Sequence, residues 1–240
     1  MKSTKLFCIP YSGGSSSVYY KWKRQLHSSI ELCPWELAGR GRRMREPFYE
    51  TVQQAADDIS NMIIEQLQGE EPYAIYGHSM GALLAYETYY ALKDKGIHEP
   101  EHVFFSGRKA PHDEAEKSEY YKLPEAEFLN VVFHYGGNTR EILQNRELLD
   151  LFVPILRADF KIAEIYQYRP HAEKIQCEIT VVNGRNDLSI SKSDIVMWSE
   201  LVDGYCQYRW ISGEHFFISE NVDATVKLIN EVLAVSGVLV

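Results

Sequence analysis

The chain has 240 residues, 45% of them hydrophobic and 25% charged, with a formal net charge of −9 at pH 7. This length suits a single α/β domain that buries roughly 70–75% of its unfolded surface, and the negative charge argues against nucleic acid as the main partner. The apolar stretch near the N-terminus is too short for a signal peptide and no run reaches about 18 apolar residues, so we expect a cytoplasmic protein without a membrane partner.

The cysteines indicate a reducing environment. Each lies in an apolar, strand-like run, and none belongs to a Cys-x-x-Cys pair; they are Cys8, Cys33, Cys177 and Cys206. We therefore expect reduced thiols of a cytosolic protein rather than a disulfide framework or a metal site.

A short first strand is predicted at residues 6–10, followed by a glycine-rich loop. The loop begins Tyr11-Ser12-Gly13-Gly14 and continues with three serines. Adjacent glycines allow backbone N–H groups to converge on one point, as in an oxyanion hole or a phosphate cradle. The remainder of a Walker pattern is missing, which disfavours a phosphate site, and an ordinary turn is the alternative. A helical segment and a strand at residues 30–37 follow.

The densest basic run of the chain lies at residues 38–45. It contains four arginines: Arg40, Arg42, Arg43 and Arg45. A run of like charges most often forms a solvated loop, which is the simple interpretation. The alternative hypothesis is a surface patch that receives an anionic partner. Thr51 and Gln54 then have the spacing of a capping box, which predicts a helix that ends near Gly69.

An apolar run at residues 73–76 predicts a buried strand, and the motif Gly77-His78-Ser79-Met80-Gly81 follows it. The pattern Gly-x-Ser-x-Gly between a strand and a helix is typical of a nucleophile elbow, whose turn is too sharp for a Cβ at the glycines. We predict that Ser79 is a catalytic nucleophile at the N-terminal end of the next helix. The simpler alternative is a strand-to-helix turn that happens to contain a serine.

The helix after the elbow is predicted to end near Lys95, with Gly96 as its C-terminal stop, and residues 102–106 predict another strand. The strand after that begins only at residue 178. A parallel crossover requires on the order of a dozen residues, so this connection carries an insertion. Its apolar spacing is largely helical. We predict a helical lid at residues 108–170 within a single domain of residues 1–240.

Two further chemical groups follow later strands. Asp187 lies in a turn after a strand predicted at residues 178–182, and His215 lies in a loop after the last predicted strand. Since the carboxyl ends of parallel strands share one edge of a sheet, both are expected near Ser79. The chain order Ser79, Asp187, His215 is that of α/β-hydrolases. It predicts a catalytic triad in which Asp187 orients the base His215.

Other acids and histidines are less well placed for these roles. Asp159 and Asp203 compete with Asp187, but neither follows a predicted strand. Seven other histidines compete with His215. His78 precedes the nucleophile, so its side chain should point away from the position of the base and a structural role is expected.

Together these motifs resemble those of the type II thioesterases that accompany nonribosomal peptide and polyketide synthases. The similarity covers nearly the whole chain. It rests on residues 10–14, 39–43, 77–82, 106–112, 156–160 and 213–217, which read PYSGG, GRGRR, GHSMGA, SGRKAPH, LRADF and GEHFF. The family pattern has Phe and Ala where this chain has Tyr11 and Ser12, and Pro in place of Ala38.

The resemblance implies an α/β-hydrolase fold, with a mostly parallel twisted sheet flanked by helices and the inserted helices as a mobile lid. It implies a thioesterase that removes acyl groups from the phosphopantetheine arm of acyl or peptidyl carrier proteins and has no cofactor of its own. By the same likeness, the backbone N–H groups of Ser12 and Met80 would form the oxyanion hole.

The resemblance suggests a specific partner for the basic run. Its arginines would meet the acidic face of a carrier domain or the phosphate of the arm. Two other functions stay open: a free-standing carboxylesterase that acts on soluble esters, and a non-catalytic protein that binds a synthase.

Overall fold

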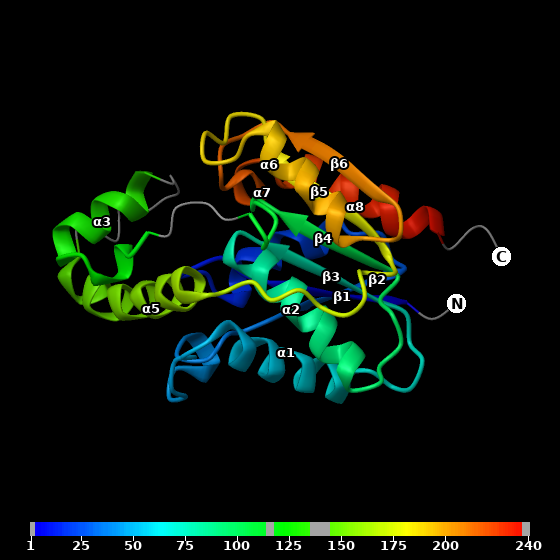
Figure 1. The fold of residues 1–240 in the computed structure, drawn as a ribbon, viewed down its shortest axis with the longest axis horizontal. Coiled ribbons are helices and arrows are strands. Elements are labelled where there is room, and N and C mark those ends of the chain that lie inside the picture. Colours follow the sequence, from blue (N-terminus) through cyan, green and yellow to red (C-terminus); the bar gives the residue numbers. More distant parts are fainter. Residues whose placement is uncertain (1–2, 114–117, 135–144, 237–240) are drawn as a thin grey trace.

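The computed structural model of this chain describes residues 3–113, 118–134 and 145–236. These residues form one six-stranded sheet with helices on both faces (Figure 1). The strands are β1 (Thr4–Ile9), β2 (Ile30–Pro34), β3 (Tyr73–His78), β4 (His102–Ser106), β5 (Glu178–Gly184) and β6 (Cys206–Ile211). Their order is β2-β1-β3-β4-β5-β6, and every neighbouring pair is parallel. The predicted α/β architecture is confirmed.

Helices connect these strands. The α-helices are α1 (Val52–Gln66), α2 (Met80–Asp94), α3 (Glu125–His134), α5 (Arg146–Ile165), α6 (Lys192–Val196), α7 (Phe217–Glu220) and α8 (Val222–Ser236). Shorter 3₁₀ segments are η1 (Ser16–Arg24), η2 (Gly41–Arg43), η3 (Tyr120–Lys122) and η4 (Met197–Leu201). Within the described ranges, no helix is both long and apolar enough to span a membrane.

Alternate residues of each strand point to opposite faces of the sheet, which gives the protein two cores. In β4, Val103 and Phe105 pack in one core with α1 and α2, whereas Phe104 packs in the other with η1, α7 and α8. All three side chains are fully buried. Strands that are buried on both faces read as continuous apolar runs, which is the pattern that the sequence shows.

Local signals account for several element ends. Thr51 Oγ1 accepts the N–H of Gln54 at 3.1 Å and caps α1. The side chain of Gln54 accepts the N–H of Glu50, at 2.8 Å, instead of completing the predicted box with Thr51. Strand β2 ends at Pro34, earlier than predicted; one further bond to β1 follows, in which the N–H of Trp35 donates to the carbonyl of Cys8 at 2.8 Å.

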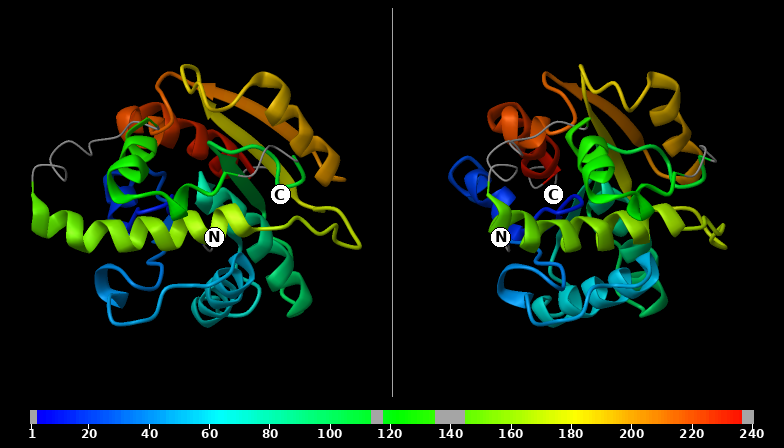
Figure 2. Two further views of the ribbon diagram at one scale, coloured as in Figure 1. Left: turned by 60° about the vertical axis from the view of Figure 1, so that its left-hand side comes forward. Right: turned by 90° about the vertical axis from the view of Figure 1, so that its left-hand side faces the viewer.

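The connection between β4 and β5 is helical where it is described. It contains η3, α3 and α5, which lie beyond the carboxyl edge of the sheet (Figure 1, Figure 2). Helix α5 is a single helix that continues through Pro154. Phe128, Val132 and Leu156 join α3 to α5 in a small core of their own. Of the predicted lid, residues 114–117 and 135–144 lie outside the described residues, and its mobility stays a prediction.

Candidate active site

The turn from β3 to α2 presents Ser79 in a strained conformation. Ser79 has φ 55° and ψ −117°, and it is the one non-glycine residue with positive φ in the described part of the chain. A Cβ at Gly77 would lie 2.0 Å from the carbonyl oxygen of Gly81, and a Cβ at Gly81 would lie 2.2 Å from that of Ile9. Both glycines are therefore required by the turn, and strain of this kind concentrates at functional sites.

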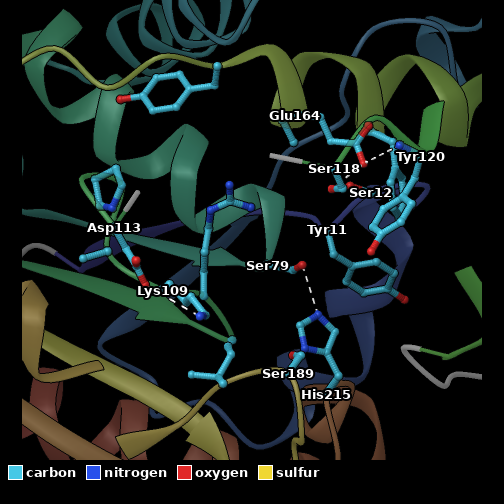
Figure 3. Close-up of a pocket in the computed structure, with 18 of the residues that line it drawn as sticks. Tyr11, Ser12, Ser79, Lys109, Asp113, Ser118, Tyr120, Glu164, Ser189 and His215 are labelled. Carbon is cyan, nitrogen blue, oxygen red and sulfur yellow. Dashed lines mark hydrogen bonds and ion pairs between the residues drawn. The ribbon is translucent and has the colours of Figure 1, made fainter. Parts of the chain in front are cut away.

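The structure brings Ser79, His215 and Asp187 together from three loops. Nε2 of His215 lies 3.0 Å from the Oγ of Ser79 (Figure 3). Nδ1 of the same ring lies 2.7 Å from Oδ2 of Asp187. Asp187 follows β5 and His215 follows β6, so all three come from the carboxyl edge of the sheet. With Nδ1–H donated to Asp187, Nε2 is the nitrogen able to accept the serine proton.

Asp187 is held as a carboxylate by its neighbours. Its burial alone would raise its pKa, but the hydrogen bond and positive charge of His215 and two hydrogen bonds from Ser189 lower the pKa below its usual value. The backbone N–H and the hydroxyl of Ser189 donate to Oδ1 at 2.9 and 2.6 Å. Oδ2 remains for His215. Ser189 was not among the residues predicted from the sequence, although an Asp with a Ser two residues later is a common turn spacing.

The glycine-rich loop, residues 11–14, lies beside the elbow. The missing side chain at Gly81 lets the carbonyls of Ile9 and Pro10 approach α2, which brings the start of the loop to the N-terminus of that helix. Ser12 lines the same cavity as Ser79, and Met80 is the first residue of α2. Among the described residues, neither N–H donates to a protein acceptor. This placement is compatible with the predicted oxyanion hole.

A cavity of about 710 Å³ lies between the sheet edge and the inserted helices, and Ser79 and His215 open into it. Figure 3 shows Tyr11 and Ser12 on one side of Ser79 and Lys109 and Asp113 on the other. The walls differ in chemistry. Residues 107–113, after β4, form a largely polar wall, and the inserted helices supply an apolar one that consists of Val132, Leu156, Phe160 and Ala163.

His78 supports the site from inside the core. The Tyr76 hydroxyl donates to the Oγ of Ser106 at 2.9 Å, and Nδ1 of His78 lies 2.8 Å from the same oxygen. The His78 ring is fully buried and its centroid is 5.3 Å from that of His215. Burial, followed by the neighbouring His215, lowers the pKa of His78 well below its usual value. His78 therefore stays neutral, in agreement with the structural role predicted for it.

The four arginines do not form one surface patch. Arg40 is only 3% exposed, and its guanidinium makes a bidentate ion pair with Asp159 at 2.6 Å for each bond. Arg43 is turned inward to Asp58 and Glu46. Only Arg42 and Arg45 are exposed. The prediction of a surface patch is wrong for Arg40, because a buried guanidinium that is paired with a carboxylate cannot meet a partner.

Asp159 acts as a link between distant segments. It lies on α5, is 2% exposed, and accepts the N–H of Gly13 at 2.7 Å through the oxygen that also binds Arg40. Arg40 in turn donates to the carbonyl of Gly14 at 3.2 Å. The inserted helix, the loop after β2 and the glycine-rich loop are thus joined by one buried ion pair. Sequence spacing could not show this pair, since its members are 119 residues apart.

The described residues contain neither a cluster of metal ligands nor a disulfide. No group of three or more histidine, cysteine or carboxylate side chains there could hold a metal ion. All four cysteines are unpaired thiols; Cys8 and Cys177 are buried, and the other two are partly buried.

Comparison with known proteins gives a consistent result. A family model of the thioesterase domain matches residues 4–233. The gramicidin S biosynthesis protein GrsT of Aneurinibacillus migulanus is 34% identical over 219 residues, which cover 90% of this chain and 84% of that protein. The crystal structure of ClbQ from the colibactin NRPS/PKS pathway covers the whole of both chains with a TM-score of 0.94 at 29% identity. YbtT, a type II thioesterase from the yersiniabactin NRPS/PKS pathway, has a TM-score of 0.85 at 27% identity and covers 97% of this chain and 94% of its own.

Proposed function

The chain belongs to the thioesterase family and is a type II thioesterase of nonribosomal peptide and polyketide biosynthesis, and from this premise we propose that it removes acyl groups from the phosphopantetheine arm of acyl or peptidyl carrier domains. The observation that carries the chemical part is the relay at Ser79. Its Oγ lies 3.0 Å from Nε2 of His215, and Nδ1 of that ring lies 2.7 Å from Asp187. These are the distances that proton transfer from a nucleophile to a base requires.

In the first step, the Oγ of Ser79 attacks the thioester carbonyl while Nε2 of His215 takes the hydroxyl proton. The carboxylate of Asp187 holds the ring in the productive tautomer and stabilises the imidazolium that forms. The hydrogen bonds and charge of its partners lower the pKa of Asp187, which favours the negative form that this role needs. The strained turn at Ser79 keeps its oxygen clear of the sheet edge.

The tetrahedral intermediate carries a negative oxygen that needs donors. The N–H groups of Met80 and Ser12 are proposed to fill this role, because Ser12 lines the cavity and Met80 directly follows the nucleophile. The N-terminus of α2 adds its positive end. Removal of one such donor from other hydrolases costs roughly 3 to 4 kcal/mol of transition-state stabilisation. Two donors would therefore supply a major part of the rate enhancement.

Collapse of the intermediate releases the arm as a thiol. A thiol pKa near 8.5 makes thiolate a good leaving group, so acid assistance from the His215 imidazolium is less demanding than for an amine. The ring then activates a water molecule, which attacks the acyl-serine ester and restores Ser79. Since bond cleavage is easy, selectivity should depend on acyl fit in the cavity and on recognition of the carrier.

The proposal is tested by comparing hydrolysis of an acyl carrier protein with that of a soluble ester of the same acyl group. We expect a higher kcat/KM for the carrier thioester. Ser79→Ala should lower kcat on it at least about 10³-fold while far-UV circular dichroism stays unchanged. Ser199→Ala, which changes an exposed serine on η4, is the matched control and should match the wild type.

Three results would contradict this function. Turnover by Ser79→Ala close to that of the wild type would remove Ser79 from the mechanism. A clear preference for the soluble ester would favour a carboxylesterase. Failure of a fluorophosphonate probe to label the wild-type serine, together with no hydrolysis of either substrate, would favour a non-catalytic binding protein.

A further inference from the structure

Leu188 is unusual in its exposure. Its side chain is 100% exposed, whereas the other exposed large hydrophobic side chains of the described residues range from 40% to 62%. A single exposed leucine is common on protein surfaces. Two further observations separate Leu188 from that background: its backbone is held by hydrogen bonds, and the next two residues, Ser189 and Ile190, line the cavity.

The backbone on either side of Leu188 is held by the Asp187 carboxylate. Oδ1 of Asp187 accepts both the N–H and the hydroxyl of Ser189, at 2.9 and 2.6 Å, and the N–H of Asp187 donates to Gly184 at 3.3 Å. The leucine therefore sits at the centre of a short turn closed by three hydrogen bonds. Such a turn does not let the side chain fold back onto the protein, so its apolar surface stays in water until a partner covers it.

The turn is part of the rim of the cavity. Ser189 and Ile190 line the cavity together with Ser79 and His215, and Figure 3 places Ser189 next to His215. The ion pair between Lys109 of the polar wall and Asp194, at 3.2 Å, ties the start of α6 to the same wall. A large partner that approaches the cavity from the side of this turn, with its tethered group at Ser79, would contact Leu188.

The charges near Leu188 suit an anionic partner. Arg185 and Lys192, on either side of the turn in the sequence, are exposed, and no ion pair involves either of them within the described ranges. An arm that is joined to its carrier through a phosphodiester brings one negative charge to the carrier surface, beside the point where the arm leaves it. Cations at the rim are complementary to that charge.

We propose that Leu188, with Arg185 and Lys192, is the docking point for the carrier domain whose arm enters the cavity. This inference rests on the proposed function, and it assigns the contact to the β5–α6 loop rather than to the arginine run. The partner surface that fits is an apolar spot beside the phosphodiester. Contact at Leu188 would cover a side chain whose backbone is already ordered, so that binding has to order only the side chain itself.

The test compares steady-state kinetics on an acyl carrier protein with those on a small soluble thioester of the same acyl group. Leu188→Ser should raise KM for the carrier substrate about tenfold, because one buried leucine anchor is worth about that factor. Its kinetics on the soluble thioester should stay within about twofold of the wild type. Leu151→Ser is the matched control, since Leu151 is an exposed leucine on α5, and it should change neither substrate.

A charge variant tests the same surface independently. Arg185→Glu with Lys192→Glu should raise KM for the carrier substrate and reduce its dependence on salt. The inference is overturned if Leu188→Ser acts no more strongly than Leu151→Ser, if it affects both substrates equally, or if Arg42→Glu with Arg45→Glu alone raises KM. No hydrolysis of any carrier substrate by the wild type would instead contradict the proposed function.

Discussion

Breaking the buried pair of Arg40 and Asp159 from one side should cost far more stability than breaking any surface pair. Both side chains are 3% exposed, and Arg40 donates to the two carboxylate oxygens at 2.6 Å each. Asp159→Asn keeps the size of the side chain and an oxygen that can accept the N–H of Gly13. It removes the charge, however, and leaves the Arg40 guanidinium buried without a counter-ion.

The expected loss is about 3–5 kcal/mol of unfolding free energy, the usual cost of breaking a buried ion pair from one side. In a domain of this size, about 1 kcal/mol shifts Tm by roughly 2–4 °C, so Tm should fall by about 6–20 °C. Asp150→Asn is the matched control on the same helix. It removes one of two carboxylate partners of Arg146, which also pairs with Glu125; the Arg146–Asp150 pair is 69% and 58% exposed, and the expected loss is below about 1 kcal/mol.

Urea unfolding followed by tryptophan fluorescence measures both variants. The double variant Arg40→Met with Asp159→Leu removes both charges and should regain most of the lost stability, because replacing a buried pair with apolar side chains is often neutral. The reasoning is refuted if Asp159→Asn destabilises no more than Asp150→Asn. It is also refuted if the double variant is as unstable as Asp159→Asn, since the unpaired charge would then not be the cause.

Two further predictions follow from buried groups. Burial lowers the pKa of His102 to about 4 and lowers that of His78 well below its usual value, so the unfolded chain binds protons at these sites below about pH 6.5 while the folded chain does not. The free energy of unfolding should therefore decrease from pH 7 to pH 5. In urea unfolding, His102→Gln should make this decrease about 2 kcal/mol smaller. A decrease equal to that of the wild type would contradict a lowered pKa at His102. Gly81→Ala places a Cβ 2.2 Å from the carbonyl oxygen of Ile9, so it should lower kcat on a soluble thioester at least about tenfold. Gly69→Ala is the control: its Cβ would have no atom within 4 Å, and kcat should not change. Equal kcat values for the two variants would show that the elbow tolerates a Cβ at residue 81.

The sequence predicted the catalytic residues because their positions follow from the order and direction of the strands. Ser79, Asp187 and His215 each follow a parallel strand, and parallel strands end at one edge, so their meeting did not depend on any long-range detail. The helix caps at Thr51 and Gly96 are equally local. These features depend on backbone geometry within a few residues, which is what a single sequence records best.

The features that were missed depend on a distant partner. Arg40 belongs to a run of like charges that suggests a solvated loop, and only Asp159, 119 residues away, explains its burial. The exposure of Leu188 could not be predicted either, since an apolar residue beside a predicted strand is expected to be buried. The apolar spacing of the insertion also did not show that residues 146–165 form one helix, since Pro154 lies within α5 and does not end it.

The same ion pair limits which part of the predicted lid can open. If α5 swung away from the sheet while Arg40 stayed buried, Asp159 would leave the N–H of Gly13 and the guanidinium would lose its counter-ion, at a cost of about 3–5 kcal/mol, and such a state would hold below about 1% of the molecules. The C-terminal end of α5 is held as well, since the Tyr166 hydroxyl next to it donates to Glu87 of α2 at 2.5 Å. These contacts predict that α5 is a fixed wall of the cavity. A lid hypothesis is left with η3, α3 and the segments that join them, whose contacts with α5 include partly exposed hydrogen bonds such as those to Glu164.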